Sequence, residues 1–132
     1  MAELNEIRSH KDLKIWQLGM EIAETIYDIT GSFPGDERFG MTSQLRRSAV
    51  SVPANIAEGN ARSSTKEYLY HLSVAIGSLA EVETLLDLAV RLKYGNSDAL
   101  RSLLNELVEE RRMLRGLQRA LRARLQPGTP DL

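Results

Sequence analysis

The feature that most constrains the fold is a stripe of leucines towards the end of the sequence. Between residues 97 and 125, leucines recur at helical spacings of three, four and seven: Leu100, Leu103, Leu104, Leu107, Leu114, Leu117, Leu121 and Leu125. Because an α-helix repeats every 3.6 residues, this spacing places the side chains on one face. Such a long apolar face needs other apolar surfaces to cover it. The stripe therefore predicts a fold of packed helices.

Three further segments, residues 12–30, 41–59 and 64–94, show the same helical spacing of apolar residues. Ser64 followed by Glu67 fits the capping box that opens many helices. No segment alternates apolar and polar residues as a strand does. We therefore expect an all-α fold, with helices near 12–30, 41–59, 64–94 and 97–125 packed as an antiparallel up-down-up-down four-helix bundle. Phe33 and Phe39, in the first connection, are expected to cap its core.

Length and composition fit one globular domain. The 132 residues, 42% of them hydrophobic, suffice for one core, so we expect a single domain over 1–132 with loosely ordered tails at 1–10 and 126–132. The absence of cysteine excludes disulfides and thiolate metal sites. The sequence contains neither a signal-peptide pattern nor an apolar run of ~20 residues. We expect a cytoplasmic protein with no membrane segment.

The stretch "QLRRSAVSVPANIAEGNARSS", residues 44–64, combines features that soluble helices usually avoid. Pro53 lies inside an expected helix, where the missing backbone hydrogen bond predicts a kink or a new start. The stretch also contains small residues (Ser48, Ala49, Ser51, Ala54 and Ala57), and the next helix has a similar strip: Ser73, Gly77, Ala80 and Thr84. Glycine inside a helix costs roughly 1 kcal/mol relative to alanine, so Gly77 predicts a close approach of the two backbones.

The polar residues of this region are interpreted as structural. An antiparallel turn near residues 61–62 brings Arg46 and Arg47 within reach of Glu81, and we expect one of the two arginines to form an interhelical ion pair with it. Asn55 and Glu58 are expected to fasten the turn. The alternative is a catalytic carboxylate–arginine site, but no nucleophile, paired acids or phosphate-binding loop accompanies these residues.

The sequence offers no set of residues for metal, cofactor or catalytic chemistry. His10 and His71 are the only histidines. Glu67 and His71 could supply two metal ligands on one helix face, whereas zinc sites use about three or four protein ligands. No phosphate-binding glycine motif appears. We therefore expect a non-enzymatic protein without a metal or cofactor.

Charge is distributed unevenly along the chain. The net charge is −1, yet residues 111–132 hold six arginines and one acidic residue, Asp131. The helix dipole favours cations at a helix C-terminus and accounts for about two or three of these arginines. In the expected bundle, this helix end lies beside the connection near residues 60–66. The sequence thus predicts a basic end formed by Arg115, Arg119, Arg122, Arg124, Arg62 and Lys66.

Several motifs carry a resemblance to a known family. The pieces "FP", "E-x-F-G", "Q-L-R-R-S", "N-I-A-E-G" and "G-S-L-A-E" occur within residues 33–89, and the combination resembles the 23S rRNA intervening-sequence proteins, also called the four-helix bundle protein family. The resemblance covers roughly residues 12–94. It implies a four-helix bundle that assembles as a homopentamer and has no enzymatic activity. Similar accessory variability determinants of diversity-generating retroelements bind nucleic acid and a reverse transcriptase.

Two functions remain open. In the first, a homopentameric accessory protein uses its basic end to contact the RNA or DNA backbone weakly and without sequence preference. In the second, the oligomer is a protein–protein interaction scaffold with no nucleic-acid role, and a reverse transcriptase partner is implied by the resemblance alone. Apolar residues outside the narrowest stripes suggest subunit contacts in either case; these are Ile15, Ile22, Ile29, Val74 and Leu85.

Overall fold

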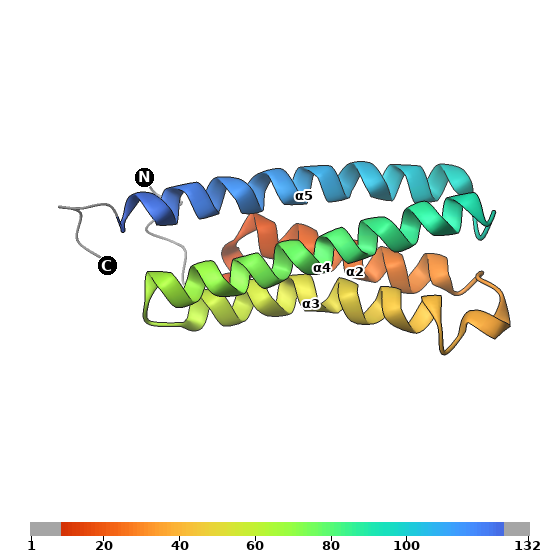
Figure 1. Ribbon diagram of the computed structural model, residues 1–132, viewed down its shortest axis with the longest axis horizontal. Coiled ribbons are helices and arrows are strands. Elements are labelled where there is room, and N and C mark those ends of the chain that lie inside the picture. Colours follow the sequence, from red (N-terminus) through yellow and green to blue (C-terminus); the bar gives the residue numbers. More distant parts are fainter. Residues whose placement is uncertain (1–8, 126–132) are drawn as a thin grey trace.

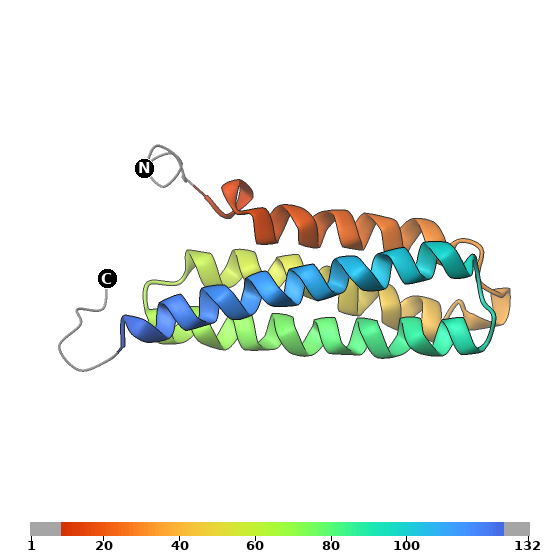
Figure 2. The same ribbon diagram turned by 90° about the horizontal axis from the view of Figure 1, so that it is seen from above.

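The computed structural model describes residues 9–125, which form four α-helices and contain no strand (Figure 1). The helices are α2 (Lys14–Thr30), α3 (Met41–Ala61), α4 (Thr65–Arg91) and α5 (Ser97–Ala123). Two short 3-10 helices precede α2 and α3, namely η1 (His10–Asp12) and η2 (Gly35–Glu37). The chain reverses direction at each connection, and two perpendicular views show the helices side by side (Figures 1 and 2).

The helix boundaries follow the local capping chemistry. The Ser64 hydroxyl accepts the Glu67 backbone N–H and donates to the Glu67 carboxylate, so the predicted capping box is present at the start of α4. Asn96 caps α5 by accepting the Ala99 backbone N–H. At the other end of the chain, Ser9 and His10 fall in the segment expected to be a loose tail; the Ser9 hydroxyl caps η1 by accepting the Lys11 backbone N–H. The rest of the expected tails, residues 1–8 and 126–132, lies outside the described residues.

The core forms where the apolar faces of the four helices meet. Each helix packs on two others: α2 on α3 and α5, and α4 on α3 and α5. The leucine stripe of α5 supplies the buried side chains of Leu100, Leu103, Leu107, Leu114 and Leu121. The residues expected to supply subunit contacts are instead largely part of this core. Ile15 and Ile22 are buried, and Ile29 and Leu85 pack against the buried cluster.

The close approaches occur at Gly19 and Gly59, not at Gly77 as the small-residue strip predicted. A Cβ atom on Gly59 would lie 2.9 Å from Tyr68 Cδ1 and 3.0 Å from His71 Cβ, so this glycine sets the spacing between α3 and α4. A Cβ atom on Gly77 would meet nothing within 4 Å. Gly77 is exposed, because the small residues of α4 lie on its outer face. Helical spacing located the strip correctly but did not reveal which face is buried.

Pro53 is accommodated inside α3, which runs as one helix from Met41 to Ala61. The proline is buried, and its ring lies against Gly19 of α2, where an added Cβ would come within 3.5 Å of Pro53 Cβ. Glycine and proline thus meet at the α2–α3 contact. Of the two outcomes expected at Pro53, a new helix start does not occur.

Glu110 of α5 reaches this same place and is the most unusual side chain in the core. Its exposed fraction is 0%, and neither carboxylate oxygen has a hydrogen-bond partner among the described residues. A Cβ atom on Gly19 would lie only 2.9 Å from Glu110 Oε2, so the missing side chain of Gly19 makes room for the carboxyl group. Burial raises the pKa of Glu110 from 4.5 to about 8. At neutral pH the folded protein therefore holds a protonated carboxyl group in its core.

This protonation predicts that the protein loses stability as the pH rises. The unfolded chain releases the Glu110 proton near pH 4.5, whereas the folded chain keeps it until about pH 8. Between these values the folded state binds more protons, so the free energy of unfolding should fall with increasing pH, by about 5 kcal/mol in total. The contribution is fully present below pH 4.5 and lost by about pH 8. Urea denaturation followed by circular dichroism measures this change.

A neutral isostere and an exposed glutamate provide the matched variants. Glu110→Gln should remove most of the fall in stability between acidic and mildly alkaline pH, since glutamine does not ionise. Glu81→Gln, on the exposed face of α4, should leave the pH dependence of the wild type intact. A wild-type protein that is equally stable at both ends of this pH range would show that Glu110 does not titrate as described.

Candidate nucleic-acid interface

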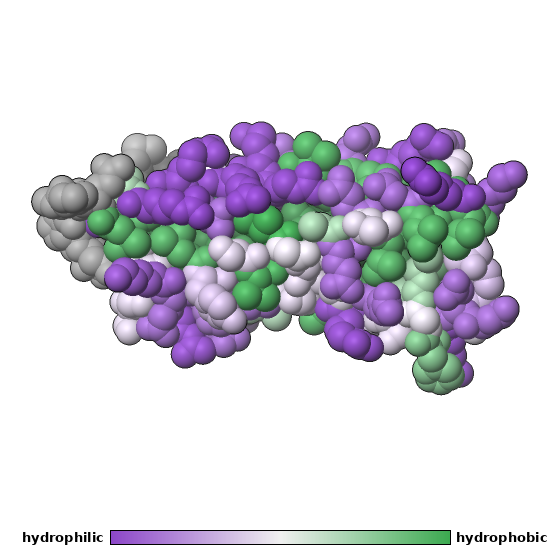
Figure 3. Space-filling model, in the orientation of Figure 1, coloured by the Kyte–Doolittle hydropathy of each residue, from purple (hydrophilic) through white to green (hydrophobic). Residues whose placement is uncertain are grey.

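Three of the predicted arginines form an exposed row along the last turns of α5. Arg115, Arg119 and Arg122 follow one another at spacings of four and three residues, which places them on one face of the helix. All three are exposed. Figure 3 shows hydrophilic side chains along the upper edge of the molecule, where α5 runs. We call Arg115, Arg119 and Arg122 the α5 arginine row.

No acidic side chain among residues 9–125 neutralises the charges of this row. No carboxylate forms an ion pair with Arg115, Arg119 or Arg122 among the described residues. Arg115 donates to the Gln118 side-chain oxygen at 3.1 Å, and the buried Gln118 amide donates to Ser73 of α4 at 3.2 Å. These neutral contacts orient the start of the row and leave its charge available to an anion.

The preceding arginines of α5 are paired instead. Arg111 forms an ion pair with Glu83 of α4, and Arg112 forms one with Glu109 one turn away. The hydrogen bond from Arg112 lowers the pKa of the Glu109 carboxyl. The paired and the unpaired arginines thus occupy successive turns of one helix. Beyond Arg111 and Arg112, the α5 arginine row presents positive charge that no described carboxylate pairs with.

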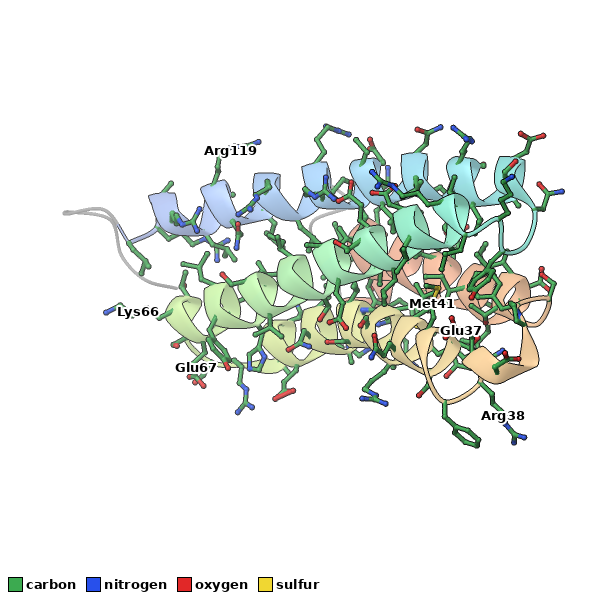
Figure 4. The ribbon with its side chains drawn as sticks, turned by 45° about the vertical axis from the view of Figure 1, so that its right-hand side comes forward. Glu37, Arg38, Met41, Lys66, Glu67 and Arg119 are labelled. Carbon is green, nitrogen blue, oxygen red and sulfur yellow. The ribbon has the colours of Figure 1, made fainter. Side chains whose placement is uncertain are left out.

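Arg124, Arg62 and Lys66 do not extend the row. Arg124 lies near Tyr68 at the start of α4: burial raises the Tyr68 pKa, while the Asn60 hydrogen bond and the Arg124 charge act in the opposite direction. Arg62 is held by Glu58 at 2.7 Å, which neutralises it. Figure 4 shows Arg119 pointing away from the bundle and Lys66 projecting from the end of α4. The predicted basic residues share one end of the molecule but point in different directions.

Asn55 and Glu58 of α3 both face His71 of α4. Asn55 Oδ1 lies 3.1 Å from His71 Nδ1, and the Asn55 amide donates to the Ser51 backbone oxygen at 2.9 Å. Glu58 Oε2 lies 3.7 Å from His71 Nε2. These contacts fasten α3 to α4 near their connection. The sequence did not identify His71 as the shared partner, because helical spacing does not give the rotation of one helix against another.

The ion pair expected between Glu81 and Arg46 or Arg47 does not form. Arg46 turns towards α2, where Nε donates to Thr30 Oγ1 at 3.0 Å and an Nη group donates to the Tyr27 backbone oxygen at 3.2 Å. Its guanidinium also lies 4.7 Å from the centre of the Tyr27 ring. Arg46 thereby binds the C-terminal end of α2, which carries the negative end of the helix dipole.

Arg47 and Glu81 remain near each other without pairing. Both line a groove of about 250 Å³ between α3 and α4, together with Ser51 and Ser78, whose hydroxyl groups are hydrogen-bonded at 2.8 Å. Arg47 donates to Ser43 one turn away. The sequence correctly placed Arg47 and Glu81 on neighbouring helices. The hydrogen bond between α3 and α4 at this point, however, joins Ser51 and Ser78.

The described residues offer little for other chemistry. No three histidine or acidic side chains among them are grouped to hold a metal ion. Across residues 9–125, no helix is both long and apolar enough to span a bilayer. The arginines of α5 and the surfaces around the α2–α3 connection therefore remain the chemically distinctive parts of the molecule.

Comparisons with known proteins identify the family. The family model described as 23S rRNA-intervening sequence protein matches residues 11–116. The chain belongs to this family. A crystal structure of a protein with unknown function, from the S23 ribosomal protein family of Bacteroides thetaiotaomicron, has the same fold, with a TM-score of 0.71 and 25% sequence identity. The similarity covers 79% of this chain and 97% of that chain. Among curated proteins, no match is found.

The family match ends inside α5, before most of the arginine row. Residue 116 is the last position matched, so Arg119 and Arg122 lie beyond the part of the chain that this intervening-sequence protein shares with the family model. Arg115 lies within it. The residues that fasten α3 to α4, and the loop before α3, also lie within it.

Adjacent arginines allow a direct test of the contact between α2 and α3. Arg46→Leu removes two hydrogen bonds and a cation–π contact, so it should lower the free energy of unfolding by about 2 kcal/mol. Arg47→Leu removes only a bond to Ser43 within the same helix and should change it by less than about 0.5 kcal/mol. Chemical denaturation measures both, and equal effects of the two substitutions would contradict the assignment.

Proposed function

We propose that this intervening-sequence protein is a non-enzymatic accessory protein that contacts the RNA or DNA backbone through α5. The observation that carries the proposal is the unpaired, exposed α5 arginine row. Guanidinium groups bind phosphate oxygens through charge-assisted, often bidentate hydrogen bonds. The description of the family, 23S rRNA-intervening sequence protein, mentions ribosomal RNA and so also favours a role with nucleic acid.

Such contacts position a nucleic acid without reading its sequence. Phosphate contacts carry no base information, because every nucleotide presents the same phosphate group. Binding should depend strongly on salt, because each neutralised phosphate releases counterions. Weak binding of RNA or DNA without sequence preference follows.

The proposal includes a cytoplasmic homo-oligomer of up-down-up-down bundles, a homopentamer according to the family resemblance. Exposed apolar side chains support subunit contacts: Met20, Tyr27, Val50, Tyr70, Leu88, Leu92 and Val108 are each more than a third exposed. In a cyclic oligomer every subunit points the same way, so the arginine row is repeated around the ring. Repetition raises avidity when one strand reaches several subunits.

A protein–protein interaction scaffold is the second candidate. One observation favours it: an apolar groove of about 450 Å³ between α2 and α3, lined by Met20, Ala23, Glu24, Tyr27, Val50 and Pro53. Grooves of this kind accept apolar side chains of a protein partner. A reverse transcriptase as that partner rests on the family resemblance alone.

The oligomer is tested by mass in solution. Light scattering coupled to size-exclusion chromatography should give about five times the mass of the 14.8 kDa chain. The mass should not change between low and moderate salt, because apolar contacts are little screened. A mass equal to one chain would contradict the oligomer.

The nucleic-acid contact is tested by reversing charge in the row. Labelled RNA and single-stranded DNA should bind the wild type at low salt, and fluorescence anisotropy should show at least a tenfold weaker affinity for the Arg119→Glu, Arg122→Glu variant. A matched variant, Arg101→Glu, reverses an exposed arginine near the opposite end of α5 and should retain most of the affinity.

The oligomeric mass of each variant must equal that of the wild type for the comparison to hold, and light scattering checks this. No binding by the wild type, or equal affinities for wild type and double variant, would exclude the α5 contact. In that case, retention of oligomeric mass would favour the scaffold.

A further inference from the structure

A second positively charged surface lies at the opposite end of the molecule from the α5 arginine row. Figure 4 shows Arg38 at one end of the bundle and Arg119 and Lys66 towards the other. Arg38 belongs to the loop before α3, where a hollow of about 370 Å³ opens at the surface. Its walls are Tyr27, Arg38, Phe39, Thr42, Ser43, Arg46 and Arg47. We call this the loop hollow.

The charge of the loop hollow is entirely positive. Three of its seven residues are arginines, none is acidic, and no carboxylate forms an ion pair with them in the described part of the chain. Arg46 uses Nε and one Nη group to bind α2, and Arg47 uses one Nη group for Ser43. Their remaining donors, and those of Arg38, are available to a ligand. Glu81 shares the neighbouring groove with Arg47 but does not pair with it, so three arginines with no acidic residue among the walls of the hollow favour binding of an anionic group.

Phe39 gives the loop hollow its second property. Phenylalanine is expected in the core, yet 86% of this side chain is exposed, more than any other large apolar residue described. The Arg38 guanidinium lies 5.2 Å from the ring centre and contacts one side of the ring. An exposed aromatic face beside a cation is the arrangement on which nucleic-acid bases stack.

The loop that carries Phe39 is held in place by contacts at its base. Glu37 accepts the Met41 backbone N–H at 3.1 Å and the Tyr94 hydroxyl at 2.9 Å, so it ties the loop to the start of α3 and to the connection that follows α4 (Figure 4 labels Glu37 and Met41). Arg38 and Phe39 follow directly. The ring is therefore presented to solvent by a supported loop, which lowers the entropy cost of using it in binding.

We propose that the loop hollow binds a nucleotide unit, with the phosphate held by Arg38 and Arg47 and the base stacked on Phe39. The unit is either a free nucleotide or part of a single strand. The volume of about 370 Å³ falls in the range of roughly 300–1,000 Å³ found for small-molecule sites. An acidic peptide would satisfy the arginines but would leave the aromatic face unused. This site lies apart from the α5 arginine row and does not depend on it.

Phenylalanine labelling provides a specific readout. The chain has only two phenylalanines, and Phe33 is buried, so fluorophenylalanine gives one reporter at the site and one internal control in the core. Fluorine NMR of the full-length protein is recorded with an oligoadenylate of roughly ten nucleotides, its duplex, adenosine monophosphate and inorganic phosphate. The Phe39 resonance should shift with the single strand, and the Phe33 resonance should not. The duplex should produce no shift, since its bases are already stacked.

Affinity measurements with variants test separately the stacking of the base on Phe39 and the binding of the phosphate by the arginines. Phe39→Leu keeps an apolar side chain but removes the ring, and should weaken binding of the oligoadenylate about tenfold. Tyr70→Leu removes another exposed ring, on α4, and should leave this affinity unchanged when light scattering shows the wild-type oligomeric mass. Arg38→Gln with Arg47→Gln should weaken binding about tenfold and reduce its salt dependence by the equivalent of about one phosphate contact.

The same spectra in the Arg119→Glu, Arg122→Glu background separate this site from the α5 contact. A Phe39 shift that persists there supports the loop hollow even if α5 binds nothing. A shift with adenosine monophosphate but not the oligoadenylate supports a free nucleotide as the ligand. The proposal is overturned if no nucleotide probe moves Phe39, or if inorganic phosphate alone reproduces the shift. It is also overturned if Phe39→Leu changes the oligomeric mass and leaves nucleotide affinity unchanged.

Discussion

The burial of the leucine face of α5 is the constraint on which the rest of the structure depends. The buried leucines of this helix are covered by α2 and α4 together. Full burial of a leucine side chain contributes about 1.5–3 kcal/mol. The other helices must therefore present matching apolar faces along their length. Because the connections are short, consecutive helices can pack along their length only when they run antiparallel.

Much of the fold could be predicted from sequence, because helical spacing and capping are local. Ser64 and Glu67, for example, mark the start of α4 by their capping-box pattern. The misassigned features all depend on the rotation of one helix about its axis relative to its neighbour. Arg46 could face α4 or α2, and the structure places it on the carbonyl end of α2. Gly77 could mark a contact or an outer face, and it lies on the outer face.

The candidate sites were predictable to different degrees. The α5 arginine row could be predicted from its spacing, since residues three and four positions apart lie on the same face of a helix. The loop hollow could not be predicted in this way. It combines Tyr27 of α2 with residues of the α2–α3 connection and of α3, and Phe39, as a large apolar residue, was expected in the core. Glu110 was also missed. In the sequence, Glu110 stands in the charged run 109–112 and looks like an ordinary exposed position; only its place beside Gly19 shows that the carboxyl group is enclosed.

The enclosed carboxyl group also limits how α5 can be placed along the bundle. An apolar stripe of regularly spaced leucines packs almost as well after the helix slides by one or two turns, so leucines alone specify the axial position poorly. Glu110 removes that freedom, because the space beside Gly19 and Pro53 is matched to its carboxyl group. Any sliding would press the carboxyl group against larger neighbours and leave that space empty. Glu110 thus lowers stability while selecting a single register, as a lone polar residue does in the seam of a coiled coil.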